Sequence, residues 1–141
     1  MTRLPVRGAA PWGERGQAIT EFALVIPLLL LAMMVLLDYG RVLYAQNAIE
    51  QDARAAARFA SVSAPQADDA IRARARVMDP LVPMPDTAIQ GEGGSFYPDG
   101  TDTGQRVTVR IEVTIPLVTP FITAIVGEEA TVTAMAQDVI R

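Results

Sequence analysis

The most uneven feature of the chain is one unbroken apolar block near its N-terminus. From Phe22 to Leu37 the sequence reads FALVIPLLLLAMMVLL, with no charged and no polar side chain. With the apolar residues just upstream, its reach approaches the roughly 20 residues that a helix needs to cross a hydrocarbon core of about 30 Å. The block therefore predicts a transmembrane helix, which we assign to residues 17–38, with Asp38 at its far edge. Pro27 lies inside this helix and predicts a kink near Ala23, either for packing or as a local weak point.

Two other interpretations of the apolar block remain to be weighed. A cleaved signal peptide needs a small-x-small site just beyond its apolar region. The residues after Leu37 read DYGRVLYAQNA and offer no convincing site, and Ala53-Arg54-Ala55 fits only far downstream. A buried core helix is the other alternative, but a domain this small could hardly enclose so uniformly apolar a helix. We therefore favour the membrane segment.

Helical periodicity continues beyond the membrane segment. Six residues fall within about 40° of one direction on a helix of 3.6 residues per turn, and they are Val42, Ala45, Ile49, Ala53, Ala56 and Ala60. Because most are alanine, this stripe could approach a sheet or a neighbouring helix closely. We expect one continuous helix from Gln17 to about Ser61, roughly 65–70 Å long, with residues 39–62 outside the membrane.

The remaining residues, 63–141, predict a small α+β domain. Residues 106–115 alternate strictly: Val107, Val109, Ile111, Val113 and Ile115 form a core face, and the positions between them, Thr108 included, form a wet face. A second strand is expected over residues 129–139. The fold class is thus α+β, with a long N-terminal helix packed on a small antiparallel sheet.

Shorter elements complete the predicted domain. A second helix is plausible from Asp68 to Val77, and a short strand around Thr87 to Gln90 interrupts a loop rich in Pro, Gly and Asp. Pro116 to Val126 predicts a short apolar helix or loop that ends at Gly127. Its apolar stretch, Leu117 to Val126, could touch a membrane or a partner, or belong to the core.

Composition removes many kinds of chemistry. All 12 basic residues are arginine, and the sequence contains no Lys, His or Cys. Catalytic Ser–His or Cys–His pairs, imidazole or thiolate metal sites and Schiff-base lysines are therefore excluded. The net charge of −4 gives no reason to expect nucleic acid as a partner. The loop from Asp99 to Asp102 offers oxygen ligands that could suit Ca²⁺, but it lacks the spacing of an EF-hand, so we favour a plain turn and predict no cofactor and no metal.

The residues before the membrane segment form a basic leader, which we assign to residues 1–16. The leader contains three arginines and only one acidic residue. The positive-inside rule therefore places the leader in the cytoplasm and the C-terminal domain outside. Prolines and glycines make a stable helix in the leader unfavourable, and these are Pro5, Gly8, Pro11 and Gly13.

One acidic residue, Glu21, lies at the start of the predicted membrane segment, where a charge is unfavourable. Glu21 directly precedes Phe22, at the start of the apolar block. An ionised carboxylate inside a bilayer costs several kcal/mol unless it is paired, hydrogen-bonded or protonated. Glu21 is therefore a candidate functional residue, although it could also lie at the cytoplasmic headgroup level, where the positive end of the helix dipole would favour it.

The sequence around Glu21 resembles the processing site of type IV prepilins and Flp/Tad pilus proteins. In RGQAITEF, Gly16 matches the glycine before the scissile bond, Gln17 would become the new N-terminus, and Glu21 falls fifth in the mature chain, followed by Phe22. Many type IV pilins have Phe where this chain has Gln17, and the Flp-type pattern is looser there. The resemblance implies cleavage after Gly16 by a prepilin peptidase, and pairing of Glu21 with the N-terminal amine of a neighbouring subunit.

A longer stretch is similar to the TadE-like family of minor pseudopilins. Its marks are EFALV-x-P-LLLL, an acid-aromatic-Gly-Arg sequence at residues 38–41, and an Ala-rich helix that ends ARAAARFAS. The resemblance implies a pilin-like fold and a non-enzymatic subunit in the bacterial inner membrane, with the prepilin peptidase and other pilus subunits as partners. Two alternatives stay open: an uncleaved, single-pass interaction protein of a secretion apparatus, and an anchored exported enzyme or binding domain.

Overall fold

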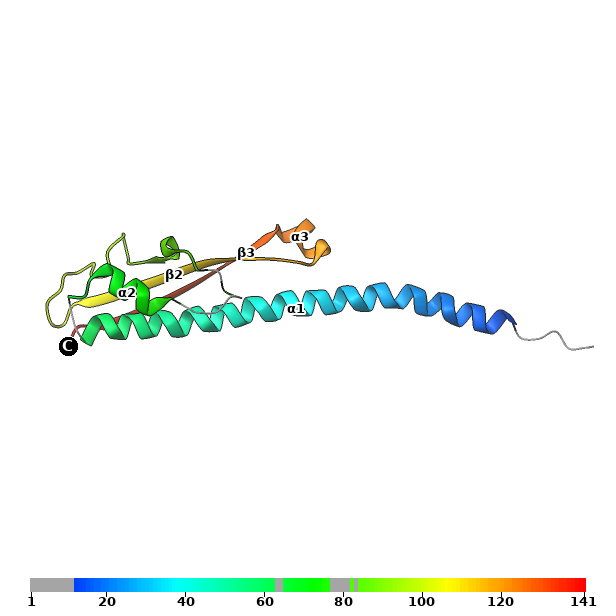
Figure 1. The fold of residues 1–141 in the computed structure, drawn as a ribbon, viewed down its shortest axis with the longest axis horizontal. Helices are drawn as coiled ribbons and strands as arrows, with labels where there is room; N and C mark the ends of the chain where they lie inside the picture. The colour runs from blue at the N-terminus through cyan, green and yellow to red at the C-terminus, as the bar shows by residue number, and fades with distance from the viewer. Residues whose placement is uncertain (1–11, 63–64, 77–81, 83) are drawn as a thin grey trace, which may run out of the picture.

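The molecule is organised along one very long helix. The computed structural model describes residues 12–62, 65–76, 82 and 84–141. Figure 1 shows α1 running the length of the molecule, with every other element gathered beside its C-terminal half. The elements are α1 (Trp12–Val62), α2 (Asp68–Ala75), the 3-10 turn η1 (Asp86–Ala88), β1 (Ile89–Gln90), β2 (Arg106–Pro116), α3 (Pro120–Val126) and β3 (Glu129–Val139). The predicted α+β class is confirmed.

The long helix begins earlier than the sequence predicts. It starts at Trp12 rather than near Gln17, so the expectation of no helix in the leader is wrong for residues 12–15. Adding a turn to an existing helix gains one hydrogen bond per residue without a new nucleus, and this can offset the roughly 1 kcal/mol cost of a glycine such as Gly13. The other leader positions thought to oppose a helix, Pro5, Gly8 and Pro11, lie outside the described residues. The helix continues through Pro27 and ends at Val62, so the predicted continuous helix is confirmed.

The alanine stripe of α1 forms one side of the core. Of its six members, Val42 is partly buried against the core and the other five are at most 1% exposed. They pack against β2 and β3. Small side chains let the helix backbone lie close to the sheet, and the larger side chains of β2 supply most of the apolar volume, as expected for a close-packed interior. The prediction that this stripe covers the domain's own sheet is confirmed.

The sheet is antiparallel, with strand order β1-β2-β3. β2 and β3 pair along their full lengths, from Arg106 opposite Val139 to Pro116 opposite Glu129. The short strand β1 adds two residues on the other side of β2, where Ile89 lies opposite Ile111. Both long strands bury alternate residues toward α1, because successive side chains of a strand point to opposite faces. The predicted strands and their inward faces are confirmed.

Thr108 departs from this alternation. The sequence places it on the wet face of β2, but its side chain is fully buried. The N–H of Thr108 donates to the carbonyl oxygen of Phe96 at 3.0 Å, so the loop after β1 continues along this edge of β2. No described residue hydrogen-bonds the hydroxyl of Thr108. The expectation of a solvated Thr108 is wrong because a long-range loop, invisible to periodicity, lies against its strand.

The shorter elements follow the sequence with small changes. The helix α2 ends at Ala75, and Val77, its expected end, lies outside the described residues. Part of the predicted strand near Thr87 is instead the turn η1, and β1 keeps only its last two residues. The helix α3 ends at Val126 and is capped by Gly127, whose φ of 106° favours glycine, as expected after a helix terminus.

Candidate membrane and assembly site

Among the residues that the structure describes, none covers the most apolar part of the N-terminal half of α1. Figure 1 shows it projecting well beyond the domain. Its large apolar side chains are exposed, with Phe22 at 66% and Leu24 at 75%. Of the helices that the structure describes, α1 alone is long and apolar enough to cross a membrane, and none of its most apolar window is buried. Exposing such a surface to water is unfavourable by about 25 cal/mol per Å², so this half requires a lipid or protein environment.

Gly16 and Gln17, the predicted processing residues, lie inside the first turns of α1. The Thr20 hydroxyl donates to the carbonyl oxygen of Gly16 at 2.9 Å, a bond within one helical turn. A Cβ at Gly16 would meet nothing within 4 Å, so packing in the monomer gives no reason for a glycine here. A protease that attacks an extended chain would first have to unwind this turn, and glycine lowers the cost of doing so.

Glu21 lies on the same face of α1 as Gln17. The side-chain amide of Gln17 donates to Oε1 of Glu21 at 3.1 Å, and both residues are exposed. Phe22 follows on the exposed apolar surface, and Pro27 and Leu37 lie further along the same half of α1. The structure thus places Gln17, a predicted processing residue, one helical turn from Glu21, which is predicted with Phe22 to act at assembly. All three lie at the end of α1 that is furthest from the folded domain.

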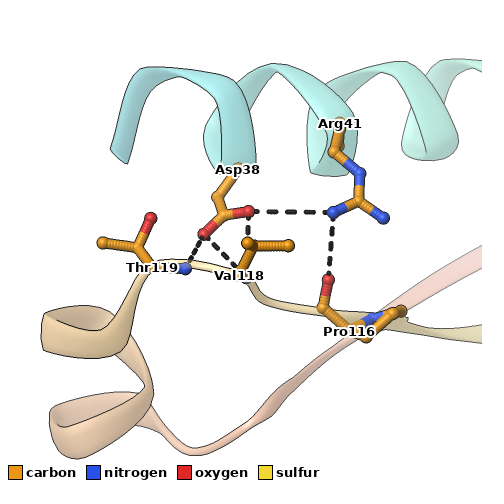
Figure 2. A network of polar contacts seen from close by, with 5 residues as sticks. All are labelled: Asp38, Arg41, Pro116, Val118 and Thr119. Carbon is orange, nitrogen blue, oxygen red and sulfur yellow. Dashed lines mark hydrogen bonds and ion pairs between the residues drawn. The ribbon is translucent and has the colours of Figure 1, made fainter. Parts of the chain in front are cut away.

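A buried carboxylate sits where the apolar half of α1 meets the domain. Asp38 is only 3% exposed. Its Oδ2 accepts hydrogen bonds from the backbone N–H of Thr119 at 2.7 Å and of Val118 at 3.0 Å, and its Oδ1 lies 3.1 Å from the same Val118 nitrogen. Figure 2 shows the carboxylate aimed from α1 at the loop between β2 and α3. Charge-assisted bonds of this kind are roughly twice as strong as neutral ones.

Arg41 adds a second tie between the same two segments. Its Nη1 lies 3.8 Å from Oδ1 of Asp38 and donates to the carbonyl oxygen of Pro116 at 3.4 Å. Figure 2 draws these three residues together with Val118 and Thr119. Asp38 and Arg41 therefore fix the loop from Pro116 to Thr119 against α1, one residue beyond the end of the apolar block.

The sequence showed both residues of this junction without revealing their role. Asp38 stood only as the far edge of the membrane segment, and Arg41 only as part of the acid-aromatic-Gly-Arg mark. The available signal was an acid placed directly after an apolar run and three residues before an arginine, a spacing that puts both on one side of a helix. Its partners are backbone N–H groups about 80 residues away, and no local pattern points to them.

The loop considered for calcium contains an ion pair. The Asp99 carboxylate accepts from Nε of Arg106 at 2.8 Å, which raises the pKa of Arg106. Within the described part of the chain, no group of three or more acidic side chains is placed to hold a metal ion. The structure thus offers Asp99 an arginine as its partner.

Comparison with known proteins gives one match. Residues 16–58 match the family model described as TadE-like protein. No curated protein and no solved structure matches the chain significantly. The match confirms the TadE-like resemblance. It begins at Gly16 and covers the exposed half of α1, the Asp38–Arg41 junction and most of the alanine stripe.

Proposed function

We propose that this protein, which carries a TadE-like segment, is a minor pseudopilin that takes part in assembling a Flp/Tad-type pilus or a related secretion filament. Its role is structural and not enzymatic. The observation that carries the proposal is the coincidence of two boundaries. The family match begins at residue 16, and the exposed apolar half of α1 follows from there to the buried Asp38.

In this proposal the chain is first inserted into the inner membrane. The leader, residues 1–16, lies in the cytoplasm, residues 17–38 cross the bilayer, and the domain lies outside. The leader carries three arginines and a single acid, Glu14, and Asp38 comes directly after the apolar block, which supports this orientation. A prepilin peptidase cleaves after Gly16 and leaves Gln17 as the new N-terminus. Gly16 supports this step, because glycine has the lowest helix propensity of any residue except proline, so the helix unwinds most easily there.

After cleavage, Glu21 serves assembly. The new amine at Gln17 carries a positive charge, and the Glu21 carboxylate of a neighbouring subunit neutralises it inside the apolar bundle. The exposure of Glu21, with only an uncharged amide as its described side-chain partner, supports its availability to another subunit. A buried ion pair of this kind adds little net stability, but it can fix the register between helices.

The alternative is a single-pass anchored interaction protein that is never cleaved or polymerised. It shares the exposed apolar helix and the outward domain, and differs in keeping the leader and in not joining a filament. Mass spectrometry of the protein purified from its host, with and without an active prepilin peptidase, separates the two. The proposal expects a chain that begins at Gln17 only when the peptidase is active.

A matched pair of glycine variants sharpens this experiment. Gly16→Leu should remain uncleaved in the presence of the peptidase. Gly40→Ala, which changes another glycine of α1 whose Cβ would meet nothing within 4 Å, should be cleaved normally. A chain that keeps Met1 in peptidase-positive cells would refute the proposed processing and favour the uncleaved anchor.

A further inference from the structure

The stretch from Leu117 to Val126, which includes α3, forms an apolar tip that is only partly buried in the core. The sequence left the stretch from Leu117 to Val126 open between core, partner and membrane. In the structure three of its large side chains are exposed: Val118 at 60%, Ile125 at 70% and Val126 at 66%. The stretch contains no charged residue. The sheet and α1 bury their apolar faces against each other, whereas this end of the domain keeps apolar side chains exposed.

The position of this tip is fixed along α1. The Asp38 carboxylate holds the backbone of Val118 and Thr119, the residues that lead into α3. In Figure 1, α3 is the end of the domain nearest to the projecting half of α1, and it lies beside the helix rather than beyond its far end. The tip is therefore level with the end of the apolar block.

Helix geometry then gives the depth of the tip relative to the bilayer. Residues 19–37 rise about 27 Å along a helix, at 1.5 Å per residue, which nearly matches a hydrocarbon core of about 30 Å. If these residues fill the core, Asp38 stands at its outer boundary. The exposed side chains of α3 then lie at the level where headgroups meet acyl chains.

We propose that α3 is a second membrane contact, which dips Val118, Ile125 and Val126 into the outer surface of the bilayer beside the transmembrane half of α1. The proposal rests on the membrane insertion described under the proposed function. The chemistry of the tip suits a lipid surface, because short apolar elements bind at this boundary through the apolar area that they bury. Glu128 and Glu129 follow Gly127 and are exposed, so the proposed contact keeps these two carboxylates in water.

The junction makes this contact compatible with the lipid. A free carboxylate at the bilayer surface beside an apolar tip would oppose its insertion. The Asp38 carboxylate is instead buried and saturated by two backbone N–H groups and the nearby Arg41 guanidinium. Continuity with the membrane segment favours a lipid surface as the occupant of the tip over a second subunit, since the tip is tied to the residue where that segment ends.

The absence of cysteine from the sequence allows a direct test. Full-length variants Leu30→Cys, Ile125→Cys and Asp102→Cys would each be labelled with an environment-sensitive fluorophore and reconstituted into vesicles of phosphatidylethanolamine and phosphatidylglycerol. All three positions are exposed in the monomer, so labelling leaves the core intact. Quenching by lipids that carry a spin label near the headgroup is then measured.

The expected result is strong quenching and a blue-shifted emission at Ile125→Cys, with several-fold less quenching at Asp102→Cys. Leu30→Cys reports insertion of α1 itself, with quenching by a label deeper in the acyl chain. Quenching at Leu30→Cys without quenching at Ile125→Cys would overturn the contact of α3 and leave the membrane segment standing. A blue-shifted emission at Ile125→Cys that develops only after partner pilins are added would also overturn the contact of α3 with lipid, in favour of a protein occupant. No quenching at either position would overturn both proposals.

Discussion

The carboxylate of Asp38 and the backbone nitrogen of Thr119 lie 2.7 Å apart, although 81 residues separate them in the chain. Asp38 belongs to the helix that carries the apolar segment, and Thr119 leads into α3. This bond therefore joins the end of the proposed membrane segment to the tip of the folded domain. Because Asp38 is buried, the bond is made largely out of contact with water, where an unpaired group is costly.

Replacing Asp38 with alanine should loosen this junction. The change leaves the N–H groups of Val118 and Thr119 without their acceptor, at a cost of about 1–3 kcal/mol. Hydrogen exchange on the purified full-length protein in detergent should show faster exchange at these two amides, while the β2–β3 ladder keeps its protection. Asp38→Asn retains one acceptor oxygen and should have a smaller effect. Unchanged exchange at both amides in Asp38→Ala would mean that the bonds do not hold the loop.

Replacing Glu21 with alanine should separate insertion from assembly. The variant lacks the carboxylate proposed to meet a neighbour's amine, but it keeps the leader and the apolar block. It should be cleaved and inserted normally, yet give several-fold less cross-linking to partner subunits in cells. Glu50→Ala is the matched control: it removes a carboxylate from the same helix outside the membrane segment, where Glu50 pairs with Arg54 at 3.0 Å. Equal cross-linking in both variants would contradict the role of Glu21.

Replacing Thr108 with valine should stabilise the domain. Its hydroxyl is buried without a described hydrogen-bond partner, and burial of an unpaired polar group costs about 1–3 kcal/mol. Valine has nearly the same shape and a high propensity for strands. Thermal unfolding in detergent should show a higher midpoint for Thr108→Val, and little change for Thr133→Val, an exposed threonine of β3. A lower midpoint for Thr108→Val would indicate that the hydroxyl is satisfied.

Asp138 should make stability depend on pH in the acid range. The N–H of Val139 lowers the pKa of Asp138 below its ordinary value of 3.8. Partial burial opposes this shift, and the hydroxyl of Ser61 and the charges of Arg141 and Arg58 reinforce it. A carboxyl whose pKa is lower in the folded state stabilises the fold above its unfolded pKa. That contribution is lost as the pH falls through the lower, folded pKa.

The measurement compares the thermal midpoints of the original protein and Asp138→Asn from about pH 6 down to about pH 2.5. The original protein should be the more stable of the two above about pH 4, and the gap should close as the pH falls. Comparing the two proteins removes the contribution of the other carboxyl groups, which both share. A gap that stays constant over this range would show that the bond from the Ser61 hydroxyl, 2.9 Å from Oδ2 of Asp138, does not depend on the charge.

Periodicity predicted the parts of the fold that local chemistry determines. The alternation from Val107 to Ile115 identified β2 and its inward face, because a strand buried on one side must alternate. The spacing from Ala45 to Ala60 identified the side of α1 that meets the sheet, for the same reason at the helical period. Gly16, Gln17 and Glu21 were identified through the resemblance to a prepilin processing site rather than through periodicity, and their roles stay predictions.

Contacts between distant segments could not be predicted in this way. Burial of Thr108 depends on the path of the loop that contains Phe96, and burial of Asp38 depends on where β2 ends. Neither path leaves a periodic signal. The early start of α1 at Trp12 was missed for a different reason, because glycine and proline were weighed residue by residue. Helix extension depends on the whole helix, and a helix already formed continues at little cost.

The unbroken course of α1 has a mechanical consequence. A helix without a joint between Leu37 and the alanine stripe transmits tension along its axis, so a pull on its N-terminal end acts directly on the layer where α1 meets the sheet. Force along that layer loads it in shear, parallel to the strands of the long β2–β3 pair rather than peeling them apart one bond at a time. The two ties at Asp38 and Arg41 stand at the first point that such a load would reach. In the proposed pilus subunit, a helix of this kind would act as a rod that carries the folded domain along in a fixed orientation.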